Sequence, residues 1–397
     1  MELYPELALE RVMKVQDVIL RAISGKILWM QAAEILGVSA RTIRRVRWRY
    51  ETYGYDGLVD HRRKRPSPKR VDLKTAEEVL RLYRDRYAGF NVRHFVEKLH
   101  EEHGIGLSYT WVKKALQGAG MVPRGRRRGA HRKRRERRPL PGMLLHVDGS
   151  RHAWLGKEHE QMDLVTLLDD ANSELYYAQL VPEEGTLSVM AGFHEVISTR
   201  GWFCALYSDR GSHFVFTPKA DGPPDRSKKT QIERALYQLG IELIAAHSPQ
   251  ARGRCERLYG TLQGRLPQEL RLRRIETVEE ANRFLREVFI ADFNRRFMVS
   301  AAQKGTAFIP YRGRDLHRIL SCQVERVVDN DNTVRFDNLR LQLPRQAFRF
   351  SLARCRVVVC SHLDQTLSVY YGAHCLGRYA SDGTLQPSLT AARRSAA

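Results

Sequence analysis

The spacing of apolar positions divides the chain into segments that predict different kinds of structure. Apolar residues recur at helical spacing over 6–23, 75–87 and 92–103. From residue 143 onward, short apolar runs typical of strands alternate with helical segments. The predicted order is strand 143–148, strand 162–169, strand 175–181, helix 186–199, strand 203–208, helix 230–239, strand 241–245 and a long helix from about 252. Three successive strands followed by this alternation predict a mixed sheet covered by helices.

Three acidic residues stand at the ends of these elements. Asp148 ends the first apolar run, Asp209 follows the run from Phe203 to Tyr207, and Glu256 lies on the long helix. The element order is typical of an RNase H-like fold, in which the first and fourth strands can lie side by side, so we expect Asp148 and Asp209 to come together. Hard divalent cations prefer oxygen ligands. Carboxylates at strand ends and on a facing helix could therefore converge on a pair of metal ions.

The long helix carries one apolar stripe that we expect to face the sheet. Its members are Cys255, Leu258, Leu262, Leu266 and Leu270. Glu256 lies beside this stripe and could point across the sheet edge toward the two aspartates. An alternative is that an acid near a helix start only complements the helix dipole.

The N-terminal segment has the pattern of a helix-turn-helix. Gly37 permits a tight turn, Ser39 can cap the second helix, and the helix after it, from Ala40 to Tyr50, is rich in arginine. Such a helix normally enters the major groove of DNA with its first residues against base edges. The alternative is an amphipathic helix pair whose basic face is merely solvated.

A second helical unit follows, in which Gly104 can end one helix and Ser108 can cap the next, from Tyr109 to Leu116. This pattern predicts a second helix-turn-helix with a longer turn. Trp111 and Leu116 could instead anchor a small helical bundle without any role in DNA binding.

Two basic segments separate these units from each other and from the apolar runs. His61–Arg70 contains two prolines and is typical of a linker, and Arg124–Arg138 carries ten basic residues and one acid. Charge of one sign at this density cannot form a core, so we expect the second segment to be disordered until it meets a phosphate backbone.

The C-terminal part shows short strand-like runs separated by turn signals. The runs are Cys322–Val328, Thr333–Phe336, Leu339–Leu343, Arg356–Cys360 and Thr366–Tyr371. Asp329–Asn332 and Asp337–Asn338 are turn signals, and together these features predict a small β-barrel.

The fold class is therefore a multidomain α/β protein with N-terminal helix-turn-helix units, an RNase H-like mixed-sheet core and a small C-terminal β-barrel. The predicted domains are 1–60, a helix-turn-helix; 61–72, a basic linker; 73–121, a second such unit; 122–141, an arginine-rich linker; 142–300, the core; 301–320, a linker; 321–380, the barrel; and 381–397, a disordered tail.

The charge balance indicates a polyanionic partner. Among 397 residues there are 67 lysines and arginines against 45 acids, a net charge of +22. Such an excess supplies the sequence-independent part of nucleic-acid affinity, although it also occurs in ribosomal proteins. We find no apolar run long enough to cross a bilayer and no signal peptide at Met1, so we expect a cytoplasmic, nucleoid-associated protein.

The six cysteines form no C-x-x-C pair, so neither a zinc ribbon nor a disulfide framework is predicted. We expect core thiols, and we interpret Cys255 as helix packing rather than as a nucleophile.

Four motifs give the chain a specific resemblance. His146–Trp154, Leu167–Ala171, Tyr207–Phe214 and His247–Glu256 resemble the motifs of the DDE transposase and integrase superfamily, and most closely those of ISNCY-type insertion-sequence transposases. The resemblance runs from the first helix-turn-helix through Asn294–Phe297. It implies that Asp148, Asp209 and Glu256 are the catalytic, metal-binding triad for two Mg²⁺ or Mn²⁺ ions.

Two features depart from the retroviral integrase pattern. Asp209 and Glu256 lie farther apart in sequence, and we interpret Thr217–Thr230 as a 14-residue loop insertion. Integrases also carry basic residues one and two turns after the glutamate, where this chain has Gly260 and Gln263. We expect nearby arginines to replace those phosphate contacts; they are Arg252, Arg254, Arg257 and Arg265.

Three further residues could be read as part of the site. Asp169 and Asp170 tempt a metal assignment, but they fall in a turn between two strands, where turn chemistry explains them. His213 could orient a water or a phosphate, or it could be a satisfied loop histidine.

The resulting hypothesis is a DNA transposase that binds the terminal inverted repeats of its element and joins them to target DNA, with at least a dimer assembled on the DNA. The predicted DNA contacts are Arg41, Thr42, Arg44, Arg45, Arg47, Lys113, Lys114, Arg126, Arg127, Arg128, Arg132, Arg134, Arg135, Arg252, Arg254 and Arg257. The alternatives are a non-catalytic DNA-binding regulator derived from a transposase, and an RNase H-type nuclease.

Overall fold

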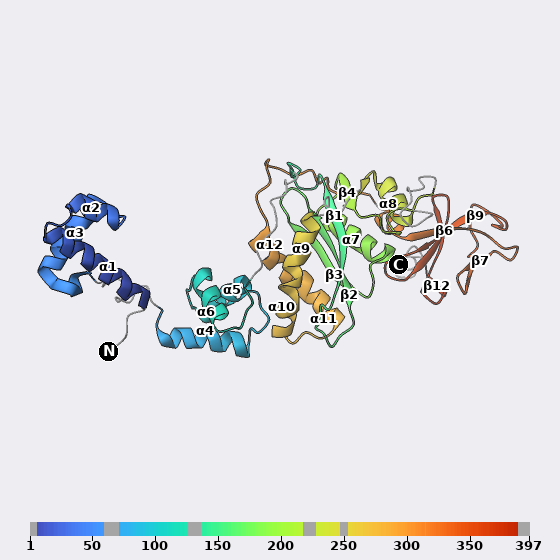
Figure 1. The fold of residues 1–397 in the computed structure, drawn as a ribbon. Coiled ribbons are helices and arrows are strands. Elements are labelled where there is room, and N and C mark those ends of the chain that lie inside the picture. The colour runs from blue at the N-terminus through green and yellow to red at the C-terminus, as the bar shows by residue number, and fades with distance from the viewer. Residues whose placement is uncertain are drawn as a thin grey trace. The chain divides into compact units, whose positions relative to one another are not determined.

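A computed structural model of the chain describes residues 6–58, 71–124, 136–216, 228–246, 253–313 and 315–387 (Figure 1). The chain forms two compact units, Met1–Glu78 and Val79–Ala397, and each is described by itself. The predicted contacts and loops at 61–70, 125–135, 217–227 and 247–252 lie outside the described residues, as does the tail from 388.

The first unit contains the predicted helix-turn-helix. Its helices are α1 (Glu6–Ile23), α2 (Trp29–Ile35) and α3 (Ala40–Tyr53), followed by the short 3₁₀ turn η1 (Gly54–Leu58). Gly37 adopts a φ of 62°, which glycine tolerates at the tight turn, and the Ser39 hydroxyl accepts a hydrogen bond of 3.2 Å from the Thr42 amide. Ile19, Ala32 and Ile43 are buried between the helices. The turn and the cap are confirmed.

A second set of helices lies at the start of the second unit. It comprises α4 (Leu73–Asp85), which spans the boundary between the units, α5 (Val92–His103) and α6 (Tyr109–Gly118). The Ser108 hydroxyl caps α6, and Gly104 ends α5 in the left-handed region. Phe95, Leu99 and Leu116 are fully buried in their shared core.

The mixed sheet has the predicted order. Its strands are β1 (Leu145–His152), β2 (Met162–Asp169), β3 (Leu175–Val181), β4 (Ala205–Ser208) and β5 (Glu242–Ala245), arranged β3-β2-β1-β4-β5. The first three strands are antiparallel, whereas β4 runs parallel to β1 and β5 runs parallel to β4. The first and fourth strands are therefore neighbours, as expected for an RNase H-like fold.

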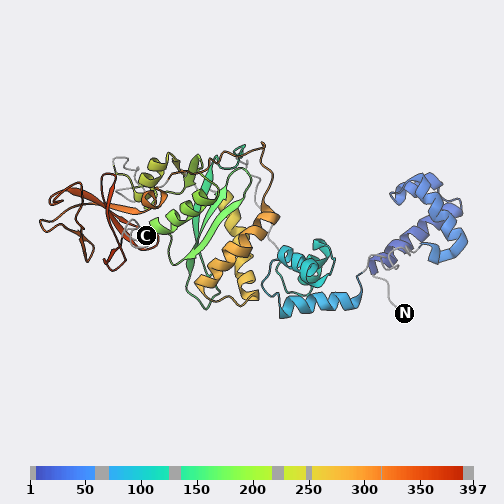
Figure 2. The ribbon, with the colours of Figure 1, turned by 180° about the vertical axis from the view of Figure 1, so that it is seen from behind.

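Helices cover both faces of this sheet (Figures 1 and 2). One face packs on α7 (Thr186–Thr199) and α8 (Gln231–Leu239). The other packs on α9 (Gly253–Gln263), α10 (Leu266–Leu272), α11 (Val278–Phe284), a π-helical turn (Leu285–Phe289) and α12 (Ile290–Phe297). In both views α7 and α8 lie on one side of the green sheet and the gold and orange helices lie on the other.

The predicted single long helix from about 252 is wrong, because it divides into α9 and α10. Pro267 lies in the first turn of α10. Within a continuous helix its ring would clash with the preceding turn and would remove one hydrogen bond, whereas the first turn of a new helix tolerates both. The apolar stripe nevertheless continues across the break, and Leu262, Leu266 and Leu270 are all buried.

The C-terminal part forms two sheets over one core. After the short helix α13 (Leu316–Ile319), the strands β6 (Cys322–Val327), β9 (Arg356–Ser361), β10 (Leu367–Tyr371), β11 (His374–Tyr379) and β12 (Leu385–Gln386) form an antiparallel sheet in the order β12-β11-β10-β9-β6. β7 (Thr333–Phe336) and β8 (Leu339–Gln342) pair only with each other. The predicted closed barrel is not confirmed, because the hairpin packs on the larger sheet through the shared apolar core rather than through strand pairing.

The prediction of core thiols holds for Cys255, Cys355 and Cys360, which are buried, but is wrong for Cys204 and Cys375, which are exposed; Cys322 is partly buried. Cys255 packs from α9 into the core between that helix and the sheet. Within the described ranges, no helix combines the length and the apolar character needed to cross a bilayer.

Candidate active site

The parallel pairing of β1 and β4 leads toward Asp148 on β1 and toward Asp209 in the turn just after β4. His146 lies opposite Tyr207 in this pair, and the two aspartates each follow two residues later. Leu145 and Leu206 pack toward α7 and α8, so the alternate residues face α9. The rings of His146 and Tyr207 accordingly lie 5.2 Å apart. The predicted pairing of the first and fourth strands is confirmed, and the convergence of the two carboxylates stays a prediction.

A buried tyrosine fixes α9 against β1 beside Asp148. The Tyr259 hydroxyl forms hydrogen bonds with the Asp148 carbonyl oxygen and, at 2.9 Å, with the Thr166 hydroxyl. Burial, followed by the nearby charge of Asp148, raises the pKa of Tyr259 well above its ordinary value. The phenol therefore keeps its proton, which it can donate to the carbonyl oxygen. The predicted apolar stripe did not include Tyr259, although its spacing from Cys255 and Leu262 places it on the same side of the helix.

Glu256 lies one turn before Tyr259 and is exposed. Gln263, one turn after Tyr259, donates a hydrogen bond of 3.1 Å to the Ser150 hydroxyl. Residues three and four apart share one side of a helix, so Glu256 lies on the side of α9 that follows β1. In the described part of the chain, no three His, Cys, Asp or Glu side chains are grouped closely enough to hold a metal ion. Glu256 is therefore on the correct side of α9 but is not gathered with the two aspartates.

The first turn of α9 is anchored by a buried ion pair. Arg254 binds Asp170, which also accepts hydrogen bonds of 2.7 Å from His146 Nε2 and from the Arg138 amide. Burial alone would raise the pKa of Asp170, but these hydrogen bonds and charges outweigh it and hold that pKa well below its usual range. The side chain of Arg254 is only 12% exposed and has a structural role in this ion pair, whereas its contact with DNA stays a prediction.

Asp169 and Asp170 thus differ in role. Asp169 accepts hydrogen bonds of 2.7 Å from the amides of Gly142 and Ala171, which confirms the turn chemistry predicted for it. Asp170 instead holds α9 to the sheet. Turn chemistry alone was therefore an incomplete explanation of this pair.

A glutamate that the sequence analysis did not consider lies next to Asp148. The Glu184 carboxylate occupies the space beside Gly149, where an added Cβ would lie 2.1 Å from its Oε2. His213 Nε2 lies 3.3 Å from Glu184 Oε1, so His213 has a partner in the protein. The available sequence signal was the position of Glu184 shortly after the apolar run that forms β3.

The predicted DNA-reading residues of α3 are all exposed: Arg41, Thr42, Arg44, Arg45 and Arg47. Arg41, Arg44, Arg45 and Trp48 line one shallow hollow. Arg47 is partly engaged within the unit, since it pairs with Glu51 at 2.7 Å and lies over the Trp29 ring.

The remaining predicted contacts divide into two groups. Lys114 and Arg257 are exposed and Lys113 is partly exposed. The others lie outside the described residues: Arg126, Arg127, Arg128, Arg132, Arg134, Arg135 and Arg252.

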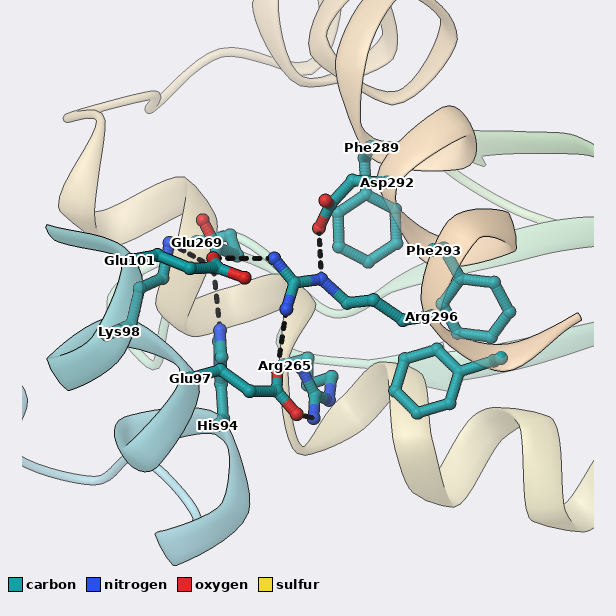
Figure 3. A pocket seen from close by; sticks show the side chains of 11 residues that line it. His94, Glu97, Lys98, Glu101, Arg265, Glu269, Phe289, Asp292, Phe293 and Arg296 are labelled. Atoms are coloured by element: carbon teal, nitrogen blue, oxygen red, sulfur yellow. Dashed lines mark hydrogen bonds and ion pairs between the residues drawn. The ribbon is translucent and has the colours of Figure 1, made fainter. Parts of the chain in front are cut away.

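A second cluster of charged side chains joins α5 to α10 and α12, and we call it the α5 junction (Figure 3). Arg265 pairs with both carboxylate oxygens of Glu97, at 2.7 and 2.9 Å, and Arg296 contacts Glu97 at 3.1 Å. Glu269 accepts from His94 at 2.6 Å and from Lys98 at 2.9 Å. Arg265 is buried in this cluster, which corrects its predicted role as a phosphate contact.

Two family models match the N-terminal part of the chain. A helix-turn-helix domain model matches residues 16–67, and a homeodomain-like domain model matches residues 42–116.

Curated relatives extend over most of the chain. A protein of Sinorhizobium fredii named transposase y4bF is 30% identical over 379 residues, covering 92% of this chain and 80% of its own length. The transposase for insertion sequence IS1202 of Streptococcus pneumoniae is 29% identical over 364 residues, covering 83% of this chain and 77% of its own.

Among solved structures, the catalytic core domain of HTLV-2 integrase in complex with magnesium is similar over 41% of this chain and 92% of its own, with 15% identity and a TM-score of 0.30. The simian T-cell lymphotropic virus intasome matches 74% of this chain and 98% of its own, with 11% identity and a TM-score of 0.33.

Proposed function

Because the chain belongs to the DDE transposase and integrase superfamily, we propose that Asp148, Asp209 and Glu256 catalyse phosphodiester hydrolysis and DNA strand transfer. The observation that carries this proposal is the β1–β4 register, in which His146 pairs with Tyr207 two residues before each aspartate. Tyr259 supports the third assignment, because it holds α9 on β1 one turn away from Glu256.

The donor set fits divalent metal ions of the Mg²⁺ or Mn²⁺ type. Carboxylate oxygens are the ligands that these hard cations prefer, and three acids from separate elements supply them. Asp148, Asp209 and Glu256 would hold these ions. When bound, such ions supply an activated water or DNA 3′-hydroxyl and stabilise the leaving oxygen.

The protein's own groups position this chemistry. Tyr259 remains neutral and hydrogen-bonded to the Asp148 carbonyl, and therefore fixes α9 to the middle of the strand that carries the first acid. The Arg254–Asp170 pair fixes the first turn of α9, which carries Glu256. No covalent protein intermediate is needed, because the attacking group belongs to water or to DNA.

DNA recognition falls to the exposed arginines of α3, which would enter the major groove at the terminal inverted repeats. Arg44 and Arg45 lie on the first two turns of that helix. Two element ends and a target must be held together, so we propose at least a dimer on double-stranded DNA, acting on the nucleoid in the cytoplasm.

The experiment uses purified protein, Mg²⁺ and labelled DNA carrying the inverted repeats that flank the gene. We expect nicking and joining by the native protein, and loss of both in Asp209→Asn with DNA binding retained. Glu279→Gln, which changes an exposed acid on α11, is the matched control and should remain active.

Other outcomes identify the alternatives. Tight binding without cleavage by the native protein would indicate a DNA-binding regulator. Preferential cleavage of an RNA–DNA hybrid would indicate an RNase H-type nuclease. Cleavage that survives Asp209→Asn would reject the proposed triad.

A further inference from the structure

We propose that Glu184 and His213 form a positioning pair that sets the relative placement of Asp148 and Asp209. The proposal rests on the proposed function, because it assigns to the two residues a task in the same site. Neither residue is proposed to bind a metal ion or to touch DNA.

The Glu184 half of the pair is fixed by β2. The Glu184 amide donates a hydrogen bond of 2.8 Å to the carboxylate of Asp163, a buried residue of β2. Its side chain then lies on Gly149, immediately after Asp148. An added Cβ at Gly149 would meet the Glu184 carboxylate at 2.1 Å, well inside any real contact. Because Gly149 has no side chain, the Glu184 carboxylate can occupy the space beside it.

The His213 half is fixed by the turn after β4. Asp209 Oδ1 accepts a hydrogen bond of 2.8 Å from the Gly211 amide. An added Cβ at Gly211 would lie 2.9 Å from the His213 ring and 3.0 Å from Asp209 Oδ1, so ring and carboxylate flank the same glycine. The ring also lies 4.2 Å, centroid to centroid, from that of the buried Phe214.

A hydrogen bond closes the link between the two halves. His213 Nε2 lies 3.3 Å from Glu184 Oε1, and both side chains are mostly buried. A continuous series of contacts thus runs from Gly149 through Glu184 and His213 to Gly211 and Asp209. The sheet fixes the backbone of the aspartates, and this series fixes the turn from which Asp209 projects. Groups that orient metal ligands without binding the metal typically change metal affinity by about 10- to 100-fold when they are removed.

The test measures Mn²⁺ binding to the full-length protein by electron paramagnetic resonance, together with the Mg²⁺ dependence of DNA cleavage. We expect His213→Leu to raise the Mn²⁺ dissociation constant about 10-fold, and to raise the Mg²⁺ concentration for half-maximal cleavage by a similar factor. His213→Gln, which can still donate a hydrogen bond to Glu184, should recover most of the affinity.

Gly149→Ala provides an independent route to the same result, because it displaces the Glu184 carboxylate without changing either member of the pair. We expect weaker Mn²⁺ binding by a similar factor. Thermal melting would establish that each variant is folded. Native Mn²⁺ affinity in folded His213→Leu and Gly149→Ala proteins would overturn the positioning role.

Asp209→Asn separates this proposal from the proposed function. If Asp209→Asn loses metal binding and cleavage while His213→Leu retains native values for both, only the positioning pair fails. If Asp209→Asn cleaves DNA like the native protein, the triad itself fails.

Discussion

The α5 junction and the proposed catalytic face, which is the face of the sheet that α9 covers, both carry charged side chains from several elements, but the signs of the charges differ. In the junction, acidic and basic groups alternate, so that Arg265 and Arg296 both contact Glu97 while Lys98 contacts Glu269. On the proposed catalytic face, the three acids of the proposed triad come from β1, the turn after β4 and α9: Asp148, Asp209 and Glu256.

This difference separates a structural from a functional use of charge. Opposite charges in a buried cluster hold elements in one arrangement, although the cost of removing them from water limits their net stabilisation. Like charges in close proximity disfavour the ionised state of one another. Under the proposed function, these acids serve to hold cations rather than to stabilise the fold.

The largest expected effect is on activity and is confined to the catalytic face. Asp148→Asn should reduce the DNA cleavage rate by about 10³-fold or more, because several kcal/mol of transition-state stabilisation depend on the metal ligands. Its melting temperature should stay at or slightly above that of the native protein, since one like charge is removed. A substantial loss of stability would show that Asp148 has the structural role we assign to the junction.

The next effect is on stability and is confined to the junction. Arg265→Met should lower the free energy of unfolding by about 3 kcal/mol, because Glu97 loses both hydrogen bonds from a buried partner. Urea unfolding of the full chain, followed by tryptophan fluorescence, would measure it. The matched control is Arg295→Met, whose side chain is 66% exposed and whose pair with Asp292 should contribute less than about 1 kcal/mol. If both variants lost the same free energy of unfolding, burial would not explain the stabilising effect of Arg265.

A smaller effect should appear as the pH falls. Burial lowers the pKa of His94 below 6.5 despite its hydrogen bond to Glu269, and the neighbouring Lys98 and Arg265 charges act in the same direction as burial. The unfolded chain therefore takes up a proton before the folded chain does, so stability is complete above pH 6.5 and declines below it.

We expect a loss of about 1 kcal/mol between pH 6.5 and 5.5 from His94. Urea midpoints at these two pH values, compared with those of His94→Gln, isolate this residue. If the variant shows the same pH dependence as the native protein, His94 is not the source. Glu269 behaves differently: its pKa is held well below the usual range, so its contribution is present above the ordinary carboxyl pKa and is lost only in strong acid.

The smallest expected effect comes from the rim of the junction. Glu101 contacts Arg296 at 2.7 Å but is 42% exposed, so Glu101→Gln should change the free energy of unfolding by less than about 0.5 kcal/mol. Urea unfolding would measure the change. A larger loss of stability would show that the exposed ion pair between Glu101 and Arg296 also stabilises the junction.

The positions of Asp148 and Asp209 could be predicted from sequence because each follows an apolar run that forms a strand. The direction in which a long cationic side chain points could not be predicted from sequence. Arg254 and Arg265 belong to the same basic stretch as Arg257, yet two of these residues turn inward to partners that are far away in sequence, Asp170 and Glu97.

Two other differences between the sequence prediction and the structure have separate causes. The break between α9 and α10 was signalled by Pro267, whereas the apolar stripe that passes across it favoured a single helix. Glu184 was missed because its significance depends on Gly149, a neighbour only in the folded sheet. Contacts between distant segments, rather than local preferences, account for the second omission.

The β1–β4 register also limits how such a chain can change in length during evolution. Residues can be gained or lost between Ser208 and Glu256 wherever a connection can lengthen, since the later helix is located by its own contacts with the sheet. A single-residue deletion between Leu145 and Asp148 would instead rotate the acid to the opposite face, among the apolar side chains that pack on α7. Insertions and deletions in related chains should therefore accumulate in the connections. They should be absent from the segment of β1 between Leu145 and Asp148 and from its partner strand β4.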